Sequence, residues 1–139
     1  MIGEFRGKYY FLSNFYSSPV EYKGKVYQNA EAAFHAQKDP SRSSEFCSLN
    51  PSEAKRLGRR VRLRFDWEDA KDSVMLGVVR AKFKNNKDFA KALLATRSEK
   101  LVEGNTRGDR YWGVCDGVGE NKLGQILEMV RDELLVQGI

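Results

Sequence analysis

The chain has 139 residues, of which 41% are hydrophobic, 12% aromatic and 31% charged. This length suits one domain with an ordinary globular core. The formal net charge of +5 favours an anionic partner such as a phosphate or a nucleic acid, although many proteins without such a partner are as basic. The densest group of cations lies between Lys55 and Arg64.

The residue inventory excludes several chemistries. One histidine and two isolated cysteines, Cys47 and Cys115, cannot supply the closely spaced ligands of a zinc deaminase. Neither a Walker A motif nor GxSxG occurs. We expect free thiols, no metal or redox cofactor, and a cytoplasmic protein, because the sequence has neither a membrane-spanning run nor a basic-then-apolar leader.

The first third of the chain predicts an extended segment, a hairpin and a helix. The aromatic stretch 9–15, YYFLSNF, is expected to be extended. Two alternating segments flank Lys23-Gly24, which predicts a hairpin turn. Asn29 is a good N-cap for a helix over 30–38, whose residues are mostly strong helix formers.

The middle of the chain predicts two helices and a strand. Asn50-Pro51-Ser52-Glu53 has the features of a helix start, and that helix is expected to end at Gly58. The range 61–65 predicts a strand rich in arginine. A longer helix is expected to start at Asp66 as its cap and to end near Asn85. Its apolar stripe comprises Trp67, Ala70, Val74, Val78 and Ala81, widened by Met75, Val79 and Phe83.

The last third predicts a short helix over 87–94, a short strand over 100–103 and a loop over 104–119. Asn121 is expected to cap a final amphipathic helix that stops near Gly138. Its inward residues are Leu123, Leu127, Val130 and Leu134. The fold class is therefore α+β, with several helices packed around a small sheet, and residues 1–139 are predicted to form one domain.

One face of the helix over 30–38 is the first candidate site. Glu31, Phe34, His35 and Lys38 follow the i, i+3, i+4, i+7 spacing and so share a face. On spacing alone, the acid and the amine are expected to be solvated. Apolar surface such as the Phe34 ring can raise the pKa of a carboxylate or lower that of an amine, and a group shifted in this way is suited to proton transfer or attack on carbon.

Other candidates lie further along the chain, and each has a plain alternative. Trp67 is a candidate ring for stacking on a base, and its plain alternative is a buried anchor in the core. In the loop 105–113, which contains Trp112, Asp109 is a further carboxylate candidate or the centre of a local turn. A glycine-rich loop, Gly117-Val118-Gly119, precedes Asn121. It either binds a phosphate or is only a tight loop, and it does not match the GxGxxG motif.

Together these motifs resemble the NADAR (NAD- and ADP-ribose-associated) family, also called YbiA-like. The resemblance runs in family order over nearly the whole chain. Its segments are FLSNFYSSP (11–19), AEAAFHAQK (30–38), SEAKRLGRRVRLRFDWE (52–68), KFKNN (82–86) and LVEGNTRGDRYWGVCDGVGENKLGQIL (101–127), followed by the final helix.

The resemblance implies an N-glycosidase. Some family members act on ribosylaminopyrimidine phosphates of the riboflavin pathway, and others remove ADP-ribose from guanine in nucleic acid. Carried over by position, Glu31 and Asp109 are the family's acids, and Lys38 matches a lysine implicated in a Schiff-base route. The expected substrate-binding residues are Asn14, Phe15, Phe34, His35, Trp67, Trp112, Gly119 and Asn121.

This chain departs from the family pattern at three places. Asn29-Ala30 stands where the family often has Ser or Thr and a hydrophobic residue. His35 replaces a frequent Gln, and Thr96-Arg97 replaces a TG dipeptide. The substrate is affected more than the fold, because His35 lies on the expected site face.

Two mechanisms and three functions follow from the resemblance. Lys38 attacks an imine formed by sugar-ring opening while Glu31 carries protons, or Glu31 or Asp109 assists direct displacement by water. ADP-ribosylated guanine in nucleic acid is the expected substrate, with a phosphorylated ribosylamine metabolite as the alternative. The third function is a non-catalytic module that binds ADP-ribose or nucleic acid.

Overall fold

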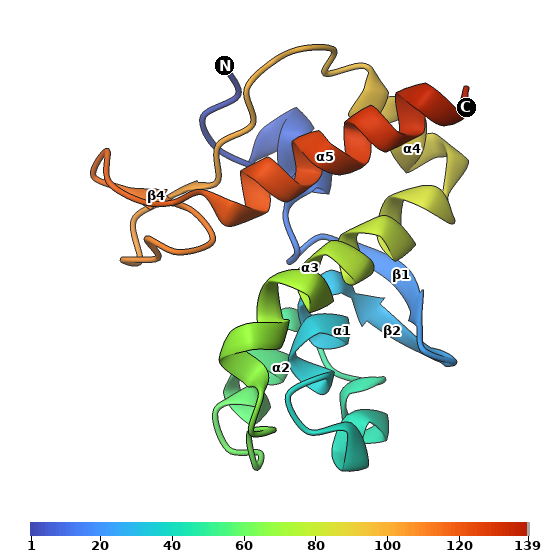
Figure 1. Ribbon diagram of the computed structural model, residues 1–139, viewed down its shortest axis with the longest axis vertical. Helices are drawn as coiled ribbons and strands as arrows, with labels where there is room; N and C mark the ends of the chain where they lie inside the picture. Colours follow the sequence, from blue (N-terminus) through green and yellow to red (C-terminus); the bar gives the residue numbers. More distant parts are fainter. Residues whose placement is uncertain (139) are drawn as a thin grey trace. The chain divides into compact units, whose positions relative to one another are not determined.

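The computed structural model describes residues 1–138, which fall into two compact units (Figure 1). One unit is the continuous range Asn14–Asn85, and the other joins Met1–Ser13 to the residues from Asn86 onward. Helices and two short two-stranded sheets make up these residues, so the α+β prediction is confirmed. That the whole chain acts as one domain stays a prediction.

The Asn14–Asn85 unit begins with the predicted hairpin. Strand β1 (Ser17–Tyr22) pairs with β2 (Lys25–Asn29) in antiparallel register. Lys23 and Gly24 form the turn with φ angles of 49° and 81°, and positive values at both central residues are what a tight hairpin requires.

Three α-helices follow in this unit, and the first two have the caps that the sequence predicts. Helix α1 (Ala30–Ala36) begins at Asn29, whose side chain accepts from the Ala32 amide. Helix α2 (Pro51–Gly58) has a complete capping box between Asn50 and Glu53 and ends at Gly58 as expected. Between them lies the 3₁₀ helix η2 (Pro40–Phe46).

Helix α3 (Trp67–Lys84) packs against β1 and α1, and its buried face differs from the predicted stripe. Val74, Val78 and Phe83 are buried as predicted, whereas Ala81 is only half-buried and its neighbour Lys82 is 1% exposed. Helix α3 therefore buries the side chain of Lys82, although the apolar pattern predicted no buried residue at this position.

Three local predictions in this region are wrong. Residues 61–65 form no strand, and the chain there runs in bends and turns. Asp66 precedes α3 without a capping hydrogen bond, because its carboxylate is held by the Arg64 guanidinium at 2.6 and 2.8 Å. The aromatic stretch 9–15, expected to be extended, lies mostly in the 3₁₀ helix η1 (Gly7–Leu12).

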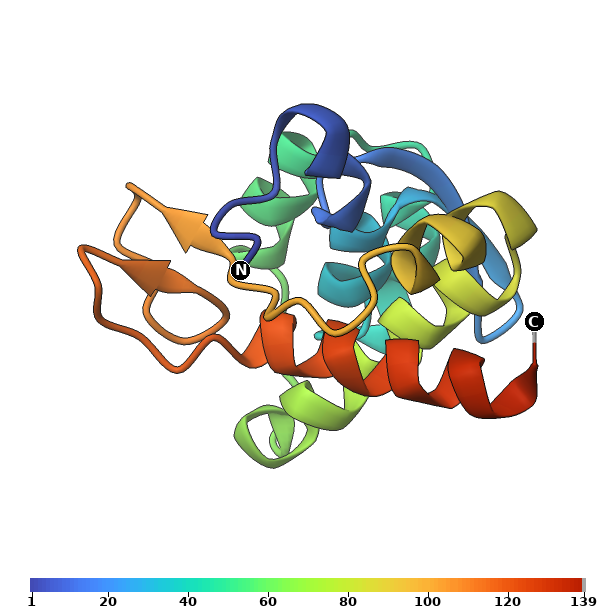
Figure 2. The same cartoon turned by 90° about the horizontal axis from the view of Figure 1, so that it is seen from above.

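The second unit contains η1, two α-helices and a parallel strand pair. Strand β3 (Gly104–Asn105) pairs with β4 (Val114–Cys115) inside the predicted loop. The expected strand over 100–103 is reduced to a single bridge between Ile2 and Leu101, which ties the N-terminal segment to the chain that follows α4 (Figure 2).

Helix α4 (Lys87–Leu94) packs against α5 (Lys122–Gln137) in this unit. The expected inward residues of α5, Leu123, Leu127, Val130 and Leu134, are all buried. Gly138 ends α5 in the left-handed conformation, as the sequence predicts. Among residues 1–138, none of the helices combines the length and hydropathy needed to cross a lipid bilayer.

Candidate active site on helix α1

Helix α1 is packed closely on nearly all sides. Four alanines, Ala30, Ala32, Ala33 and Ala36, are fully buried, and they let neighbouring elements approach the helix backbone. Glu31 and Lys38 are the two charged side chains of this segment, and both are partly exposed. Helix α1 ends at Ala36, two residues earlier than predicted, so Glu31 lies on the helix and Lys38 lies in the turn that follows it.

The carboxylate of Glu31 is held by His35, one turn further along α1. The distance from His35 Nε2 to Glu31 Oε1 is 2.8 Å, and the two side chains are 8% and 15% exposed. The imidazole is thus a buried partner of the acid, and the expected role of His35 in substrate binding stays a prediction. This contact fixes one carboxylate oxygen and leaves the second for another partner.

The tautomer of His35 follows from its surroundings. Nδ1 is buried and has no hydrogen-bond partner among the described residues. A Cβ added to Gly58 would lie 2.5 Å from this nitrogen, so α2 approaches the imidazole there. The arrangement favours a proton on Nε2, which donates to the carboxylate, because an unpaired buried N–H costs more than an unpaired lone pair.

Aromatic rings adjoin this pair on the side of Lys38. The ring centroids of Phe34 and Trp67 are 5.1 Å apart, and Lys38 Nζ lies 5.9 Å from the indole centroid. Trp67 is 5% exposed, so it is a buried core anchor, which the sequence offered as the alternative to a stacking ring. The same indole also covers the amine.

Burial of the ammonium group lowers the pKa of Lys38 below its usual value. The negative charge of Glu31 raises this pKa, while the positive charges of Arg59 and Lys55 lower it further. The net direction is downward, which increases the fraction of neutral amine near pH 7. A neutral amine is the form that attacks carbon.

Asn14 connects the chain before the hairpin to the start of α1. Its carbonyl accepts from the Glu31 amide at 3.1 Å, and its side-chain Nδ2 donates to Met75 Sδ at 3.4 Å. Phe15, the next residue, is half-buried. The hydrogen bonds and ring contacts thus link Asn14, Glu31, Phe34, His35, Lys38 and Trp67 within one compact unit.

The other predicted residues lie in the second unit. Asp109 Oδ1 accepts from the amides of Tyr111 and Trp112 at 3.1 and 2.9 Å. This is the local turn that the sequence offered as the alternative to a catalytic acid. The same carboxylate receives Arg107 Nη2 at 3.4 Å. A catalytic role for Asp109 stays a prediction.

The side chain of Asn121 does not cap α5, contrary to prediction. Asn121 has φ 53°, and its side chain accepts from the Glu103 amide and donates to the Leu101 carbonyl. Gly119 is equally constrained, since an added Cβ would lie 2.2 Å from the Gly113 carbonyl oxygen. Both residues shape the loop that leads into the helix.

The amides at the start of α5 are already used. The amides of Glu120, Asn121, Lys122 and Leu123 donate to the carbonyls of Arg110, Gly113, Tyr111 and Trp112 in that order, at 2.9–3.2 Å. A phosphate needs free N–H groups at such a helix start. These four amides are therefore not free to bind a phosphate, and substrate binding by Gly119 and Asn121 stays a prediction.

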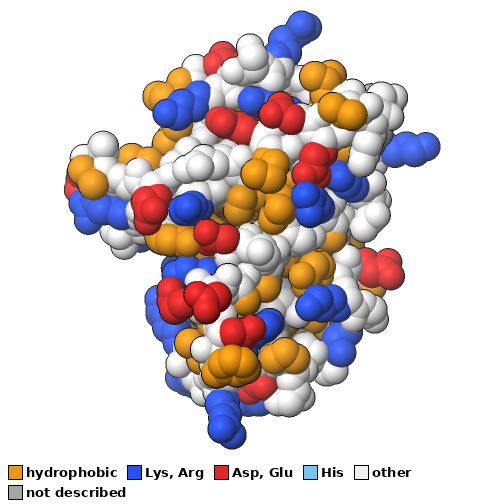
Figure 3. Space-filling view, in the orientation of Figure 1, with side chains coloured by type: hydrophobic (Ala, Val, Ile, Leu, Met, Phe, Trp, Pro, Cys, Tyr) orange, Lys and Arg blue, Asp and Glu red, His pale blue; other side chains and the backbone are white. Residues whose placement is uncertain are grey.

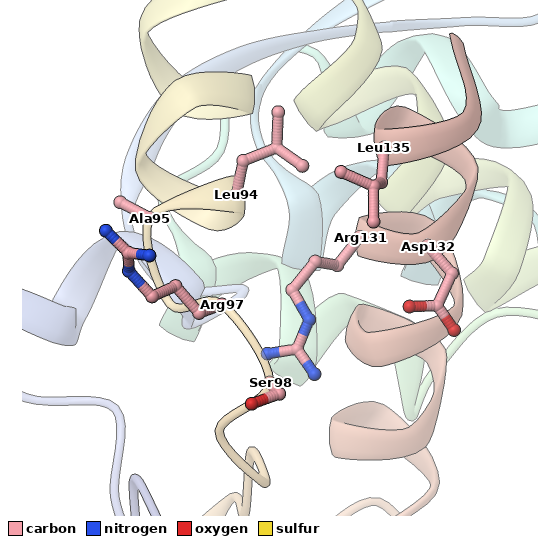
Figure 4. Close-up of a pocket in the computed structure, with 7 residues that line it drawn as sticks. All are labelled: Leu94, Ala95, Arg97, Ser98, Arg131, Asp132 and Leu135. Atoms are coloured by element: carbon pink, nitrogen blue, oxygen red, sulfur yellow. The ribbon is translucent and has the colours of Figure 1, made fainter. Parts of the chain in front are cut away.

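A hollow of about 310 Å³ adjoins the candidate site. It is lined by Lys38, Asp39, Pro40, Arg62, Leu63, Arg64 and Phe65. A larger hollow, of about 820 Å³, lies in the second unit between the end of α4 and α5 (Figure 4). None of the predicted site residues lines it.

Arg131 contributes to the larger hollow but is used structurally. Its Nη1 atom donates to Thr96 Oγ1 at 2.9 Å and to the Glu99 carbonyl at 2.8 Å. It thus fastens α5 to the turn that follows α4. Arg97 and Asp132, which also line this hollow, lie at its edge with exposed side chains (Figure 4).

Sequence reasoning missed Lys82. This lysine is 1% exposed, and burial lowers its pKa to about 7. Its Nζ lies 5.9 Å from the Tyr16 ring centroid and 5.1 Å from that of Phe83. The available signal was its position seven residues after Met75, on the same side of α3.

Among residues 1–138, no three His, Cys, Asp or Glu side chains gather as metal ligands, and both cysteines are free.

An acid fixed by a buried imidazole, together with a lysine of lowered pKa beside an indole, is the equipment of acid–base or covalent catalysis. The NADAR domain model matches residues 3–135, and the chain belongs to this family. The predicted family is therefore confirmed.

The relatives agree with this assignment. The chain is 38% identical to N-glycosidase YbiA of Escherichia coli over 91% of its own length and 82% of that protein. It is 33% identical to an N-glycosidase of Nostoc punctiforme, over 88% of this chain and 84% of the relative. A riboflavin biosynthesis protein of Vibrio vulnificus is 39% identical over 89% of this chain but only 35% of that protein.

The fold is shared as well. The NMR structure of E. coli YbiA superimposes with a TM-score of 0.87 at 36% identity, covering 99% of this chain and 87% of that one. The prediction of an N-glycosidase is confirmed at the level of the enzyme class.

Proposed function

We propose that this N-glycosidase cleaves the bond between C1′ of a ribose and an exocyclic amine, and that its substrate is ADP-ribosylated guanine in nucleic acid. The observation that carries the proposal is the arrangement of side chains on α1 and on the turn that follows it. There the carboxylate of Glu31 is oriented by His35 at 2.8 Å, and burial lowers the pKa of Lys38 beside the Trp67 ring.

The exocyclic amine matters because its nitrogen lone pair can expel the ring oxygen. In the imine route, Glu31 takes the N–H proton and returns it to the ring oxygen, so the sugar opens to an imine at C1′. The neutral amine of Lys38 adds to C1′ and passes its two protons, one on addition and one on expulsion, to the departing nitrogen, so the base leaves as an amine and a lysine imine remains at C1′. Water then adds to the lysine imine and frees the sugar and Lys38.

Direct displacement is the second route. The C1′–N bond stretches, positive charge builds on C1′ and the ring oxygen, and a carboxylate stabilises this charge while water is activated. Glu31 is the proposed carboxylate and Asp109 the alternative. This route requires no lysine, so the two routes are separable by experiment. In both, Trp67 is proposed to stack on the base or hold the sugar.

A ribosylaminopyrimidine phosphate of the riboflavin pathway is the alternative substrate. The names of relatives favour it, since the matching Vibrio vulnificus protein is a riboflavin biosynthesis protein. The cations between Lys55 and Arg64 suit a nucleic-acid strand but also a single phosphate. Charge alone therefore does not choose between the two.

The experiment supplies both substrates to the purified protein and detects the products of C1′–N cleavage by mass spectrometry. We expect release of guanine-containing nucleic acid and ADP-ribose. Glu31→Gln should lower kcat by at least about 100-fold, the usual contribution of a general acid–base group. Glu21→Gln, an exposed acid on β1, is the matched control and should leave kcat unchanged. Turnover of the ribosylaminopyrimidine phosphate alone would establish the alternative, and turnover of neither would favour a binding module.

Borohydride trapping during turnover distinguishes the two routes. We expect a reduced adduct on Lys38 that is lost in Lys38→Ala and retained in Lys91→Ala, an exposed lysine on α4. Peptide mapping separates Lys38 from Lys82, whose pKa is also lowered. Active turnover without any adduct would support direct displacement.

A further inference from the structure

The segment between α2 and α3 exposes apolar side chains beside cations. Its sequence, RRVRLRF over 59–65, alternates as a half-buried strand does, yet no strand forms. Val61 is 8% exposed, but Leu63 is 51% and Phe65 101% exposed. The Phe65 ring therefore stands clear of the rest of the described chain, and burial within this fold does not explain its presence.

The backbone that presents Phe65 is anchored on both sides. The Arg64 amide donates to the Lys38 carbonyl at 2.9 Å, which fastens the segment to the end of α1. The Trp67 amide donates to the Arg64 carbonyl at 3.2 Å, and the Arg64 guanidinium pairs with Asp66. The exposed ring is thus held in place next to the candidate catalytic lysine.

The exposed charges close to this ring in the sequence are mixed, with cations in excess. Arg59, Arg60 and Arg62 are exposed, whereas Arg64 is neutralised by Asp66. The first turn of α3 exposes the acids Glu68 and Asp69, of which Glu68 pairs with Lys71. Asp39 is the one acid that lines the adjoining hollow, and it accepts from Ser41 Oγ at 2.6 Å. In Figure 3, hydrophobic, basic and acidic side chains lie next to one another at the lower end of the molecule, over the region of α2 and the start of α3.

We propose that Arg59, Arg62, Leu63 and Phe65 form a docking surface for the unpaired nucleic-acid strand next to the modified base, with one base stacked on Phe65 and the flanking phosphates on the two arginines. An exposed aromatic ring next to cations is how proteins bind single strands, since every base has a face to stack and every linkage carries a negative charge. This inference rests on the proposed function and specifies its substrate as a strand.

The hollow beside the ring gives the strand a route to the site. It is lined by both Lys38 and Phe65, so a chain stacked on the ring continues toward the lysine amine. A second copy of this chain is a poorer occupant, because both surfaces would bring the same positive charges together. Arg59 does not line the hollow, so a ligand that reaches Arg59 as well as Phe65 and Arg62 extends beyond it, as a strand does.

The test measures fluorescence anisotropy of an unmodified, labelled 12-nucleotide single strand titrated with the purified protein. Phe65→Ala should weaken binding by about 5- to 100-fold, the range for removing one base–aromatic stack. Arg62→Gln should reduce the slope of log K against log salt by about 0.7. Val26→Ala and Lys23→Gln, exposed positions on the hairpin, are the matched controls and should bind as the unsubstituted protein does.

The outcomes separate this inference from the reaction itself, because the strand carries no ADP-ribose. Phe65→Ala could bind the strand more weakly while the unsubstituted protein hydrolyses no ADP-ribosylated substrate. That result would support the docking surface and contradict the proposed reaction. Equal binding by Phe65→Ala and the unsubstituted protein would overturn the surface. So would a change in molecular mass in solution on Phe65→Ala without a change in strand binding, which would identify an interface between copies. Thermal unfolding of each variant checks that the fold is kept.

Discussion

The imidazole of His35 and the carboxylate of Glu31 lie 2.8 Å apart on successive turns of α1, and both are largely shielded from water. An acid in this position has its orientation fixed before substrate arrives, because the helix backbone holds both partners. Preorganised groups of this kind accelerate reactions by avoiding rearrangement during the chemical step. His35 is therefore a positioning residue for Glu31.

Replacement of His35 tests this relationship. Gln at this position, which the family often carries, has an amide N–H that can donate to Glu31, so His35→Gln should retain most of the activity. His35→Leu fills the space without a donor and should lower kcat about 10- to 100-fold, because a hydrogen bond to a charged group contributes about 1.5–3 kcal/mol. Steady-state kinetics on the same substrate gives both values. Equal losses in the two variants would show that shape rather than hydrogen bonding matters.

Gly58 supplies the space that His35 occupies. A Cβ at Gly58 would lie 2.5 Å from His35 Nδ1 and 2.9 Å from Cγ, so the imidazole must shift. Ala within a helix is normally favoured over Gly, yet Gly58→Ala should lower the free energy of unfolding by about 1–3 kcal/mol, as overpacking does. It should also lower kcat, because Glu31 loses its partner.

Chemical denaturation and kinetics measure the two effects of Gly58→Ala. Gly3→Ala is the control, since its nearest atom, Met1 Cε, would be 3.6 Å away. The double substitution Gly58→Ala with His35→Ala should recover stability relative to the single one. If Gly58→Ala is as stable and as active as the unsubstituted protein, then α2 and not the imidazole of His35 shifts to accommodate the added Cβ.

Lys82 predicts a pH-dependent stability. Burial lowers its pKa from 10.5 to about 7 in the folded protein. Between these values the unfolded chain binds a proton that the folded chain does not, so stability rises with pH across this window. Below about pH 7 both states are protonated, and the full cost of burying the charge remains.

Urea denaturation between pH 7 and 9.5 measures this effect. The free energy of unfolding should rise by about 1.4 kcal/mol per pH unit at most, the limit for one proton. Lys82→Met should flatten the rise, and Lys87→Met, at an exposed position on α4, should not. The window stops below pH 10 because burial raises the pKa of Tyr22 and Tyr27, whose ionisation acts in the opposite direction. Equal slopes in the two variants would assign the effect to other groups.

The sequence predicted helices better than the segments between them, for a physical reason. Caps such as Asn29 and Asn50 act on amides three residues away, so their signals are local. The range 61–65 alternates like a strand but finds no partner strand, and pairing depends on distant residues that the pattern does not contain. Asn121 failed as a cap because its side chain bonds across the sequence to Leu101 and Glu103.

The candidate site was predicted in part by spacing and in part by resemblance. Helical spacing placed Glu31 and His35 on one face, and the hydrogen bond between them follows from that spacing. The approach of Gly58 to the imidazole, and the cover that Trp67 gives Lys38, depend on packing between elements. Burial of Lys82 escaped prediction because the hydrophobic pattern assigns a lysine to the surface.

Arg97 occupies a backbone conformation that favours glycine, with φ 56°. The family often has TG where this chain has Thr96-Arg97, and a left-handed conformation costs a non-glycine residue about 1–2 kcal/mol. Since glycine loses about 0.5–1 kcal/mol more in backbone entropy on folding, Arg97→Gly should raise the free energy of unfolding by about 0.5–1 kcal/mol. Arg97→Ala, which removes the same charge but keeps a Cβ, should give no such gain. Chemical denaturation of the unsubstituted protein and the two variants measures the free energies of unfolding. An equal increase in both variants would show that loss of the Arg97 charge, at the edge of the larger hollow, causes the increase and not relief of the backbone conformation.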